Sequence, residues 1–335
     1  MLNNGIQIIG TQRSGSNLLR VILDQSAEIA SPHPPHILVT FMPLLDSYGT
    51  LDALAYRRLV KDVVAYVHVN PVPWDGVVLD EEQLFDQSET YHLFTLNRLI
   101  YEQAAIAKNA RYWCCKSMSN VHYATEMEAF GLRPKYIFLY RDGRDVACSF
   151  KKAIVGEKHI YHLAQQWKKD QEACIRLREI LPADRFFSLN YESLITTPEA
   201  EIRKLCLFLD IEYQSDMLQF HDSKTSKQTA AAGEMWSNLE KPIISNNTGK
   251  FLKEFKGDDL NIFELVAGAV LTALHYERFA PQADPGLIAE DRLNEYDREN
   301  GILKQEALAM ARASDLENRA PQLEILKEIK SRKVS

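Results

Sequence analysis

Residues 6–25 read IQIIGTQRSGSNLLRVILDQ, and this stretch decides the fold. Three of its first four residues are isoleucine, which is apolar and β-branched, as in a buried strand. From Ser16 onward the apolar side chains recur at helical spacing, at Leu18, Leu19, Ile22 and Leu23. A strand, a glycine-containing turn and a helix in this order begin a βα unit, the unit from which parallel sheets are built.

The same alternation continues along the chain. Further strands are predicted at 111–115, 135–140 and 185–189, and helices at 51–67, 89–108, 121–130, 142–153, 159–181, 198–209 and 260–276. Residues 30–43 and 70–80 are rich in proline and are predicted to be largely irregular. The pattern predicts an α/β fold with a P-loop-like parallel β-sheet flanked by helices on both faces.

The composition changes near the C-terminus of the 335-residue chain. After Pro281 the sequence becomes charged and helix-forming, and it is interrupted at Gly301 and Pro321. We therefore expect one domain over 1–284 and a C-terminal helical extension over 285–335. This extension has three open roles: a lid, a surface clasp, or an arm that joins copies of the chain into a homo-oligomer.

Charge and cysteine content narrow the classes of partner. The formal net charge of −7 argues against a broad basic face for nucleic acid. No apolar run is long enough to span a bilayer, and no basic region precedes an apolar one as in a signal peptide. The five cysteines form no C-x-x-C pair, which favours reduced thiols over a zinc site. We expect a cytoplasmic protein.

The turn after the first strand has the glycine spacing of a phosphate-binding loop. Gly10 and Gly15 match G-x-x-x-x-G, so backbone N–H groups at a helix N-terminus would face an anion. The nucleotide-triphosphatase motif continues with Lys and then Ser or Thr, where this chain has Ser16 and Asn17. A cation stands earlier, at Arg13. The loop is suited to a phosphate but not to Mg·ATP; the alternative is an ordinary βα turn.

A second candidate segment is residues 140–150, YRDGRDVACSF. Arg141 ends a predicted strand, and this end is where open α/β sheets bind ligands. Ser149 lies about two turns into the following helix, so its hydroxyl and the Arg141 guanidinium can share one phosphate. The alternative is that the arginines pair with Asp142 and Asp145 as surface charges.

In this order the segments resemble the 3′-phosphoadenosine 5′-phosphosulfate (PAPS)-dependent sulfotransferases, in their bacterial branch. Residues 9–18 resemble the family's 5′-phosphosulfate loop, and residues 140–150 its 3′-phosphate motif. Residues 191–194, YESL, are similar to its Tyr-Glu-Asp-Leu step. Residues 248–251, TGKF, resemble the late glycine loop that closes over the donor, although the family usually has Trp where Phe251 stands.

The resemblance implies a role for individual residues. The residues implied for the 5′-phosphosulfate are Arg13, Ser14, Gly15, Ser16 and Asn17. Those implied for the 3′-phosphate and the late loop are Arg141, Ser149, Thr248, Gly249 and Lys250. Tyr191 and a loop over 225–229 would lie near the adenosine, and Lys116 would lie beside the transferring sulfuryl group.

In-line sulfuryl transfer builds charge on the leaving oxygen, so cations there are catalytic and no metal is required. We assign this role to Arg13 and Lys116. The acceptor also needs a general base, which one branch of the family supplies as a His two positions after the lysine, where this chain has Met118. Another branch uses a Glu after the first helix, where this chain has histidines. His36 is the predicted base, with His33 and His122 as the alternatives.

The implied reaction transfers a sulfuryl group from PAPS to a hydroxyl or amine and releases 3′,5′-adenosine bisphosphate. The acceptor class stays open; candidates to line its site are Phe41, Tyr91, Phe94 and Trp236. A P-loop small-molecule or nucleotide kinase is the first alternative, and Ser16 and Asn17 argue against it. A non-catalytic binding module on the same scaffold is the second, and the presence of both Arg13 and Lys116 argues against it.

Overall fold

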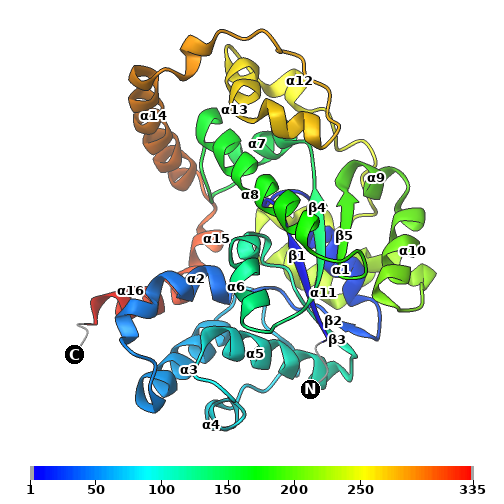
Figure 1. Ribbon diagram of the computed structural model, residues 1–335, viewed down its shortest axis with the longest axis vertical. Helices are drawn as coiled ribbons and strands as arrows, with labels where there is room; N and C mark the ends of the chain where they lie inside the picture. Colours follow the sequence, from blue (N-terminus) through cyan, green and yellow to red (C-terminus); the bar gives the residue numbers. More distant parts are fainter. Residues whose placement is uncertain (1–3, 333–335) are drawn as a thin grey trace.

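A computed structural model describes residues 4–332 of the chain. At its centre is a five-stranded sheet with the order β2-β3-β1-β4-β5 (Figure 1). Every neighbouring pair of strands is parallel. The strands are β1 (Gly5–Ile9), β2 (Ile29–Ala30), β3 (Tyr112–Cys115), β4 (Lys135–Tyr140) and β5 (Phe186–Asn190).

The fully buried strand β1 occupies the middle of the sheet. Its Ile6 is in register with Cys114 of β3 on one side, and its Ile8 with Ile137 of β4 on the other. The chain therefore forms β2 and β3 on one side of β1 and then β4 and β5 on the other. Ligands of open parallel sheets bind at such a switch point, outside the carboxyl ends of the strands.

Helices precede, connect and follow the strands. The α-helices up to β5 are α1 (Ser16–Asp24), α2 (Ile37–Phe41), α3 (Ala53–His68), α4 (Glu81–Asp86), α5 (Leu93–Lys108), α6 (Ala124–Ala129), α7 (Gly143–Lys151) and α8 (Ile160–Ile180). Those after it are α9 (Tyr191–Thr196), α10 (Pro198–Leu209), α11 (Lys224–Ala231), α12 (Phe251–Glu254), α13 (Asp259–Ala273), α14 (Glu290–Ala309), α15 (Ala313–Glu317) and α16 (Ala320–Ser331). The 3-10 helices are η1 (Met42–Tyr48), η2 (Met118–Tyr123), η3 (Ser215–Asp222), η4 (Glu234–Glu240) and η5 (Pro285–Ile288).

Both faces of the sheet are covered, because successive strand residues point to opposite sides. Ile6 and Ile8 pack with α1, α9 and α10 in one apolar cluster. Ile9 packs in a second cluster, with residues of α5, α7, α8 and α13 around the fully buried Trp167. The predicted fold class, a P-loop-like parallel sheet between helical layers, is confirmed.

Most differences from the sequence prediction are in short elements. Strand β2 was missed because it has only two residues. The predicted helix 121–130 is wrong in its first part, where η2 precedes α6. The buried Asn120 of η2 donates its side-chain amide to Gln7 of β1, a long-range contact that sequence periodicity does not encode. The predicted loop 225–229 is also wrong. It lies inside α11, whose N-cap residue Ser223 accepts a hydrogen bond from the Ser226 backbone N–H.

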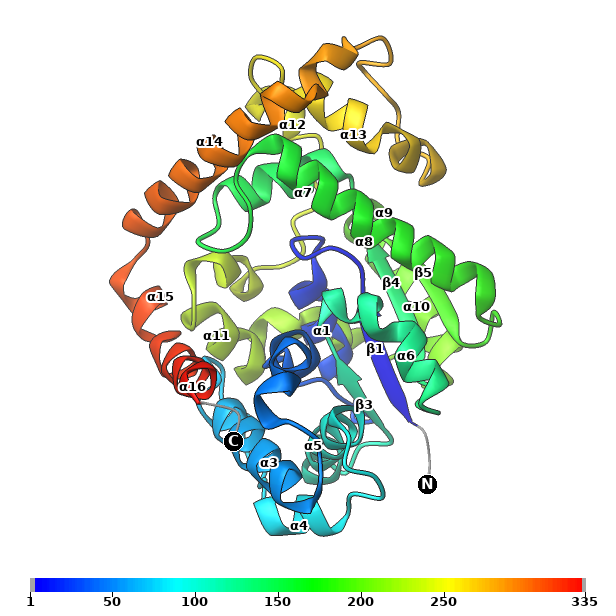
Figure 2. The same ribbon diagram turned by 60° about the vertical axis from the view of Figure 1, so that its left-hand side comes forward.

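The C-terminal helices lie along one side of the molecule, from the region of α13 down to α3 (Figure 2). At the upper end, Asn300 of α14 accepts hydrogen bonds from the Lys158 and His159 backbone N–H groups, at 2.8 and 3.0 Å. At the lower end, Arg332 pairs with Asp62 of α3 at 3.0 Å. The extension is thus fixed to two distant parts of the domain. Its separation at residue 285 stays a prediction.

Within residues 4–332, no helix combines the length and the apolarity that crossing a bilayer requires.

We predict that Asn300→Ala lowers the free energy of unfolding by about 1–3 kcal/mol, because two buried backbone N–H groups lose their acceptor. Urea denaturation followed by circular dichroism measures this. The exposed Asn294→Ala, on the same helix, is the matched control and is expected to leave stability unchanged. Equal stability of the two variants would show that Asn300 does not attach α14 to the domain.

Candidate active site

The loop between β1 and α1 can form only with glycine at two positions. Gly10 has a φ of 134°, and a Cβ there would lie 2.4 Å from the Leu139 carbonyl oxygen of β4. Gly15 has a φ of 86°, and a Cβ there would lie 2.4 Å from the Tyr191 ring. Arg13 also adopts a left-handed conformation, with a φ of 70°. The loop is therefore pressed against β4 and α9, which places its arginine beside theirs.

A cavity of about 400 Å³ opens at the carboxyl ends of β1 and β4. The first turn of α1 lines it without a side-chain cap, so its backbone N–H groups are free for an anion. The predicted donor-site residues that line it are Arg13, Gly15, Ser16, Asn17, Arg141, Ser149, Tyr191 and Lys250. Ser14, Thr248 and Gly249 lie next to these residues in the chain but outside the lining.

Direct hydrogen bonds join the two predicted phosphate motifs. Arg13 Nε donates to Ser149 Oγ at 3.0 Å, and Arg141 Nη1 donates to the Arg13 carbonyl at 3.3 Å. Arg141 Nη2 donates to the carbonyl of Asn247, in the late loop, at 2.8 Å. The Arg141 guanidinium also lies over the Tyr191 ring, 4.5 Å from its centroid. Segments from four parts of the chain therefore meet at one anion-binding surface.

Two polar atoms at this surface are buried and have no hydrogen-bond partner in the described chain: Ser14 Oγ and Arg141 Nε. Burial also lowers the pKa of Arg13 to about 10, and the positive charge of Arg141 adds to this effect. Buried donors and mutually repelling cations are stabilised by an anion placed between them. The residues present therefore fit a ligand with phosphate-like groups.

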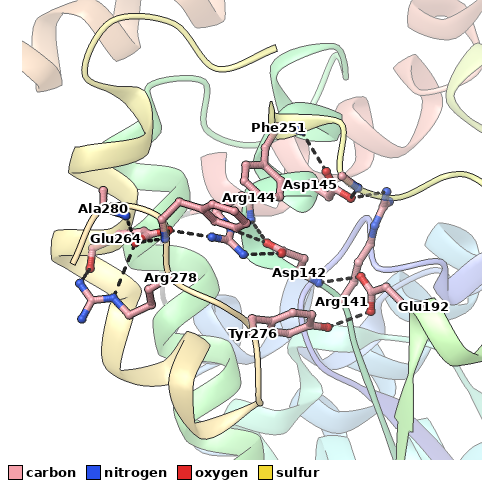
Figure 3. Close-up of polar contacts among 12 residues, drawn as sticks. Arg141, Asp142, Arg144, Asp145, Glu192, Phe251, Glu264, Tyr276, Arg278 and Ala280 are labelled. Atoms are coloured by element: carbon pink, nitrogen blue, oxygen red, sulfur yellow. Dashed lines mark hydrogen bonds and ion pairs between the residues drawn. The ribbon is translucent and has the colours of Figure 1, made fainter. Parts of the chain in front are cut away.

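A buried ionic network lies beside Arg141, around the start of α7 (Figure 3). Arg144 pairs with Asp142 at 2.7 Å and with Glu264 of α13 at 2.7 Å. Glu192 of α9 accepts a hydrogen bond from the Asp142 backbone N–H at 3.0 Å. The alternative interpretation, surface pairing of these charges, is wrong because the groups are buried. Their pairing fixes the start of α7, and with it the strand end that carries Arg141.

Asp145 connects the same helix to the late loop. Its carboxylate accepts hydrogen bonds from the backbone N–H groups of Gly249 at 2.8 Å and Phe251 at 3.1 Å, and it lies 3.6 Å from Arg141 (Figure 3). Gly249 therefore has a supporting position, while the exposed Lys250 faces the cavity. This arrangement explains why an acidic residue follows Arg141 by one helical turn.

Lys116 lies where predicted, directly after β3, and its side chain is buried. Burial, together with the charges of Arg20 and Arg13, lowers its pKa to about 7. No ion pair of the described chain includes Lys116. An amine in this environment is close to losing its proton and gains strongly from a nearby anion.

His36, the predicted base, is the N-cap residue of α2 in a left-handed conformation with a φ of 60°. Its Nδ1 lies 3.1 Å from the hydroxyl of Ser117, the neighbour of Lys116. Burial and then the charges of Lys116 and Arg319 lower its pKa to about 3. His36 is thus neutral at physiological pH and lies on the Lys116 side of the phosphate loop.

The two alternative histidines have other partners. Asn70 Nδ2 donates to the carbonyls of His33 and Val72, and it lies 3.3 Å from His33 Nδ1. The other ring nitrogen of His33, Nε2, is buried and has no partner in the described residues. His122 pairs with the buried Asp170 at 2.8 Å. His33 is therefore held by Asn70, and His122 is paired with a carboxylate.

Of the predicted aromatic lining, only Trp236 faces the cavity. Phe41 and Phe94 are core residues, and Tyr91 stacks on Tyr56 at 4.9 Å. The physical reason is that α2 and α5 turn their apolar faces toward the core cluster.

Sequence reasoning missed the fully buried Arg20 of α1. It donates to the Ser31 carbonyl at 3.1 Å and to Thr229 Oγ1 of α11 at 2.7 Å, so it joins α1 to the proline-rich loop and to α11. An arginine among the apolar residues of one short helix was the available signal. Arg319 was also missed, because its neighbours come from distant parts of the chain.

Comparison with known proteins shows the family to which the chain belongs. The family model described as "Sulfotransferase family" matches residues 5–215, more than half of the chain. The chain belongs to the sulfotransferase family and is therefore a transferase of the sulfuryl-transfer class. The match ends before the late loop and the C-terminal extension, so both lie outside the part that the family model describes.

Individual relatives are distant. A "Putative protein-tyrosine sulfotransferase" of Caenorhabditis briggsae is 22% identical over 87% of this chain and 96% of its own length. An uncharacterized protein of Aquifex aeolicus is 23% identical over 71% of this chain, which spans only 30% of that protein. The solved sulfotransferase domain of the Synechococcus PCC 7002 olefin synthase is 20% identical, covers 79% of this chain and 94% of its own, and has a TM-score of 0.54. That likeness shows the shared fold.

We predict that Lys116→Met removes a pH dependence of stability. The folded pKa of about 7 lies below the ordinary value of 10.5, so between these values only the unfolded chain holds the proton. The free energy of unfolding of the wild type therefore rises between pH 7 and pH 10.5. The variant has no buried charge and is expected to be more stable than the wild type at pH 7, and this difference shrinks as the pH rises. Urea denaturation at several pH values measures it, with the exposed Lys227→Met as control. A gain that is independent of pH would contradict the burial of this charge.

Proposed function

We propose that the protein transfers a sulfuryl group from PAPS to a hydroxyl or amine of an acceptor. One observation carries the proposal: Arg13 and Ser149 are joined at 3.0 Å, and Arg141 contacts the same loop, so two phosphate motifs share one cavity. A donor with a 5′-phosphosulfate and a 3′-phosphate needs two such anion sites within one nucleoside length. A volume near 400 Å³ is within the usual range for a small-molecule site.

The donor residues follow from their positions. The first turn of α1, with Arg13, Ser14, Gly15, Ser16 and Asn17, would hold the 5′-phosphosulfate. Arg141 and Ser149 would hold the 3′-phosphate, with Lys250 and the late-loop residues Thr248 and Gly249 closing over it. Tyr191 supports Arg141 through its ring. When bound, PAPS supplies the activated S–O bond that breaks as the acceptor oxygen or nitrogen bonds to sulfur.

Arg13 and Lys116 are the proposed catalytic cations. Each lies beside further positive charge and has its pKa lowered, so each is stabilised when negative charge develops nearby. An anion at the loop raises the pKa of Lys116 again and keeps the amine protonated. Both cations can then stabilise the electron pair that passes to the leaving bridging oxygen, with bisphosphate as the product. This role needs no metal, and Asn17 stands where a metal-binding hydroxyl would be.

His36 is the proposed general base. It is neutral because its pKa is about 3, so a ring nitrogen can accept a proton at physiological pH. With Nδ1 protonated and donating to Ser117 Oγ, Nε2 keeps its lone pair for the acceptor proton. The cytoplasm is the proposed compartment, in keeping with five free, buried cysteines. Joining of copies through the C-terminal helices stays a prediction.

We predict that 3′,5′-adenosine bisphosphate raises the melting temperature without magnesium, because a ligand bound only to the folded state stabilises it. Arg141→Ala is expected to weaken this binding by about 2–3 kcal/mol, the range of a charge-assisted contact. Thermal-shift titration measures both, with the exposed Arg176→Ala as control. Stabilisation by Mg·ATP but not by the bisphosphate would instead establish the kinase alternative.

We predict that His36→Ala retains bisphosphate affinity but loses turnover by roughly 10²–10⁴-fold, because a base acts only in the chemical step. Bisphosphate release from PAPS, measured with phenols and aliphatic alcohols as acceptors, reports turnover. His33→Ala is the matched comparison and is expected to cost less. Normal turnover in the His36 variant would assign the base elsewhere, and no turnover in the wild type with any acceptor would support the non-catalytic alternative.

A further inference from the structure

Arg319 lies in the C-terminal extension, at the N-cap position of α16. Its side chain is half-buried and extends over η4. The guanidinium lies 5.8 Å from the centre of the Trp236 ring, and Nη2 lies 4.0 Å from the sulfur of Met235. These two residues line the donor cavity. The extension thus brings a cation to the edge of the candidate active site.

The same two residues connect Arg319 to groups already assigned to the chemistry. The Met235 carbonyl accepts a hydrogen bond from Arg13 Nη2 at 3.5 Å. The Trp236 ring packs edge-on against His33 with 4.9 Å between centroids. In addition, the charge of Arg319 contributes to the low pKa of His36, after burial and Lys116. Arg319 is therefore linked through η4 to Arg13 and His33, and its charge acts on the proposed base.

The charge of Arg319 has no counter-ion in direct contact. No ion pair in the described part of the chain includes it. Asp315 is the carboxylate that acts on it electrostatically, but this side chain accepts a hydrogen bond from the Glu234 backbone N–H at 3.3 Å. Burial lowers the pKa of Arg319, as expected for a cation removed from water. A half-buried guanidinium with such neighbours gains from an anion supplied by a ligand.

Holding the extension in place does not require Arg319. Arg312 pairs with Glu234 at 2.6 Å, and Asn318 Nδ2 donates to the Ala232 carbonyl at 3.2 Å. Gln322 Nε2 donates to the Tyr66 carbonyl at 3.2 Å on the other side. These contacts fix the chain before and after residue 319. One nitrogen of the guanidinium, Nη2, contacts the Met235 sulfur, and the charge of the group acts on His36.

We infer that Arg319 binds an anionic oxygen group on the acceptor, so that the natural acceptor is a hydroxylated acid rather than a neutral alcohol. The inference rests on the proposed function, because it takes Arg13, Lys116, Arg141 and Lys250 as the cations matched to the donor. Arg319 is a further cation outside this set, and unlike the exposed Lys152 and Lys241 of the cavity lining it is half-buried. Carboxylate and phosphate both fit a guanidinium fork, and both belong to this chemistry.

The test measures binding to the full-length protein saturated with 3′,5′-adenosine bisphosphate. Thermal-shift titrations compare 4-hydroxyphenylacetate and 3-hydroxyoctanoate with their methyl esters, and 4-hydroxyphenyl phosphate separates phosphate from carboxylate. In the wild type at least one anionic probe is expected to bind about tenfold more tightly than its neutral partner. Arg319→Gln is expected to remove this preference, whereas Arg319→Lys keeps part of it. Arg312→Gln is the matched control, because it weakens the same segment without changing residue 319.

The outcomes separate the two proposals. Equal binding of acids and esters by the wild type, or no binding of any probe, overturns the inference, as does an unchanged preference in Arg319→Gln. If Arg312→Gln loses the preference for acids over esters as fully as Arg319→Gln does, Arg319 only helps to hold the C-terminal extension in place. That result also overturns the inference. Bisphosphate binding is read in the same titrations and is expected in every variant. Its absence from the wild type contradicts the proposed function, whatever the probes do.

Discussion

The structure depends on the close approach of the loop after β1 to the end of β4. A Cβ at Gly10 would meet the Leu139 carbonyl at 2.4 Å, and the Arg13 carbonyl accepts a hydrogen bond from Arg141. Because neighbouring parallel strands end at the same edge, this contact brings two cationic motifs, far apart in the sequence, to one surface. The buried network of Arg144, Asp142 and Glu264 then fixes the strand end from the opposite side.

The fold and much of the proposed donor site follow from local signals. The strand before Gly10 and the strand before Arg141 are apolar runs with turn residues after them, and each cavity-lining motif starts where such a strand ends. For this reason Arg13, Arg141 and Ser149 could be located by residue number. Missing motif residues were also informative. The nucleotide-triphosphatase motif has Lys and then Ser or Thr at the positions of Ser16 and Asn17, and this difference argues against Mg·ATP as the ligand.

The remaining features depend on contacts between distant segments, which periodicity does not encode. Asp145 supports the late loop, Arg20 joins α1 to α11, and Trp236 faces the cavity only because η4 returns to the phosphate loop. The two-residue strand β2 and the polar helix α11 are too short to give a periodic pattern. The contacts of His33 with Asn70 and of His36 with Ser117 likewise join distant segments, whose relative positions the sequence alone leaves open.

The position of the C-terminal helices also affects how related enzymes can come to differ in the acceptor that they use. The residues that surround the cavity on the phosphate side come from the strand ends, where a substitution disturbs the sheet. On the proposed role of Arg319, α15 and α16 supply a part of the acceptor site, and they are attached by side-chain contacts and by the buried Ile329. Exchange of this terminal segment alters the charge and shape offered to an acceptor without touching the sheet. On the proposed role of Arg319, acceptor preference is carried by a segment that contributes no strand to the central sheet.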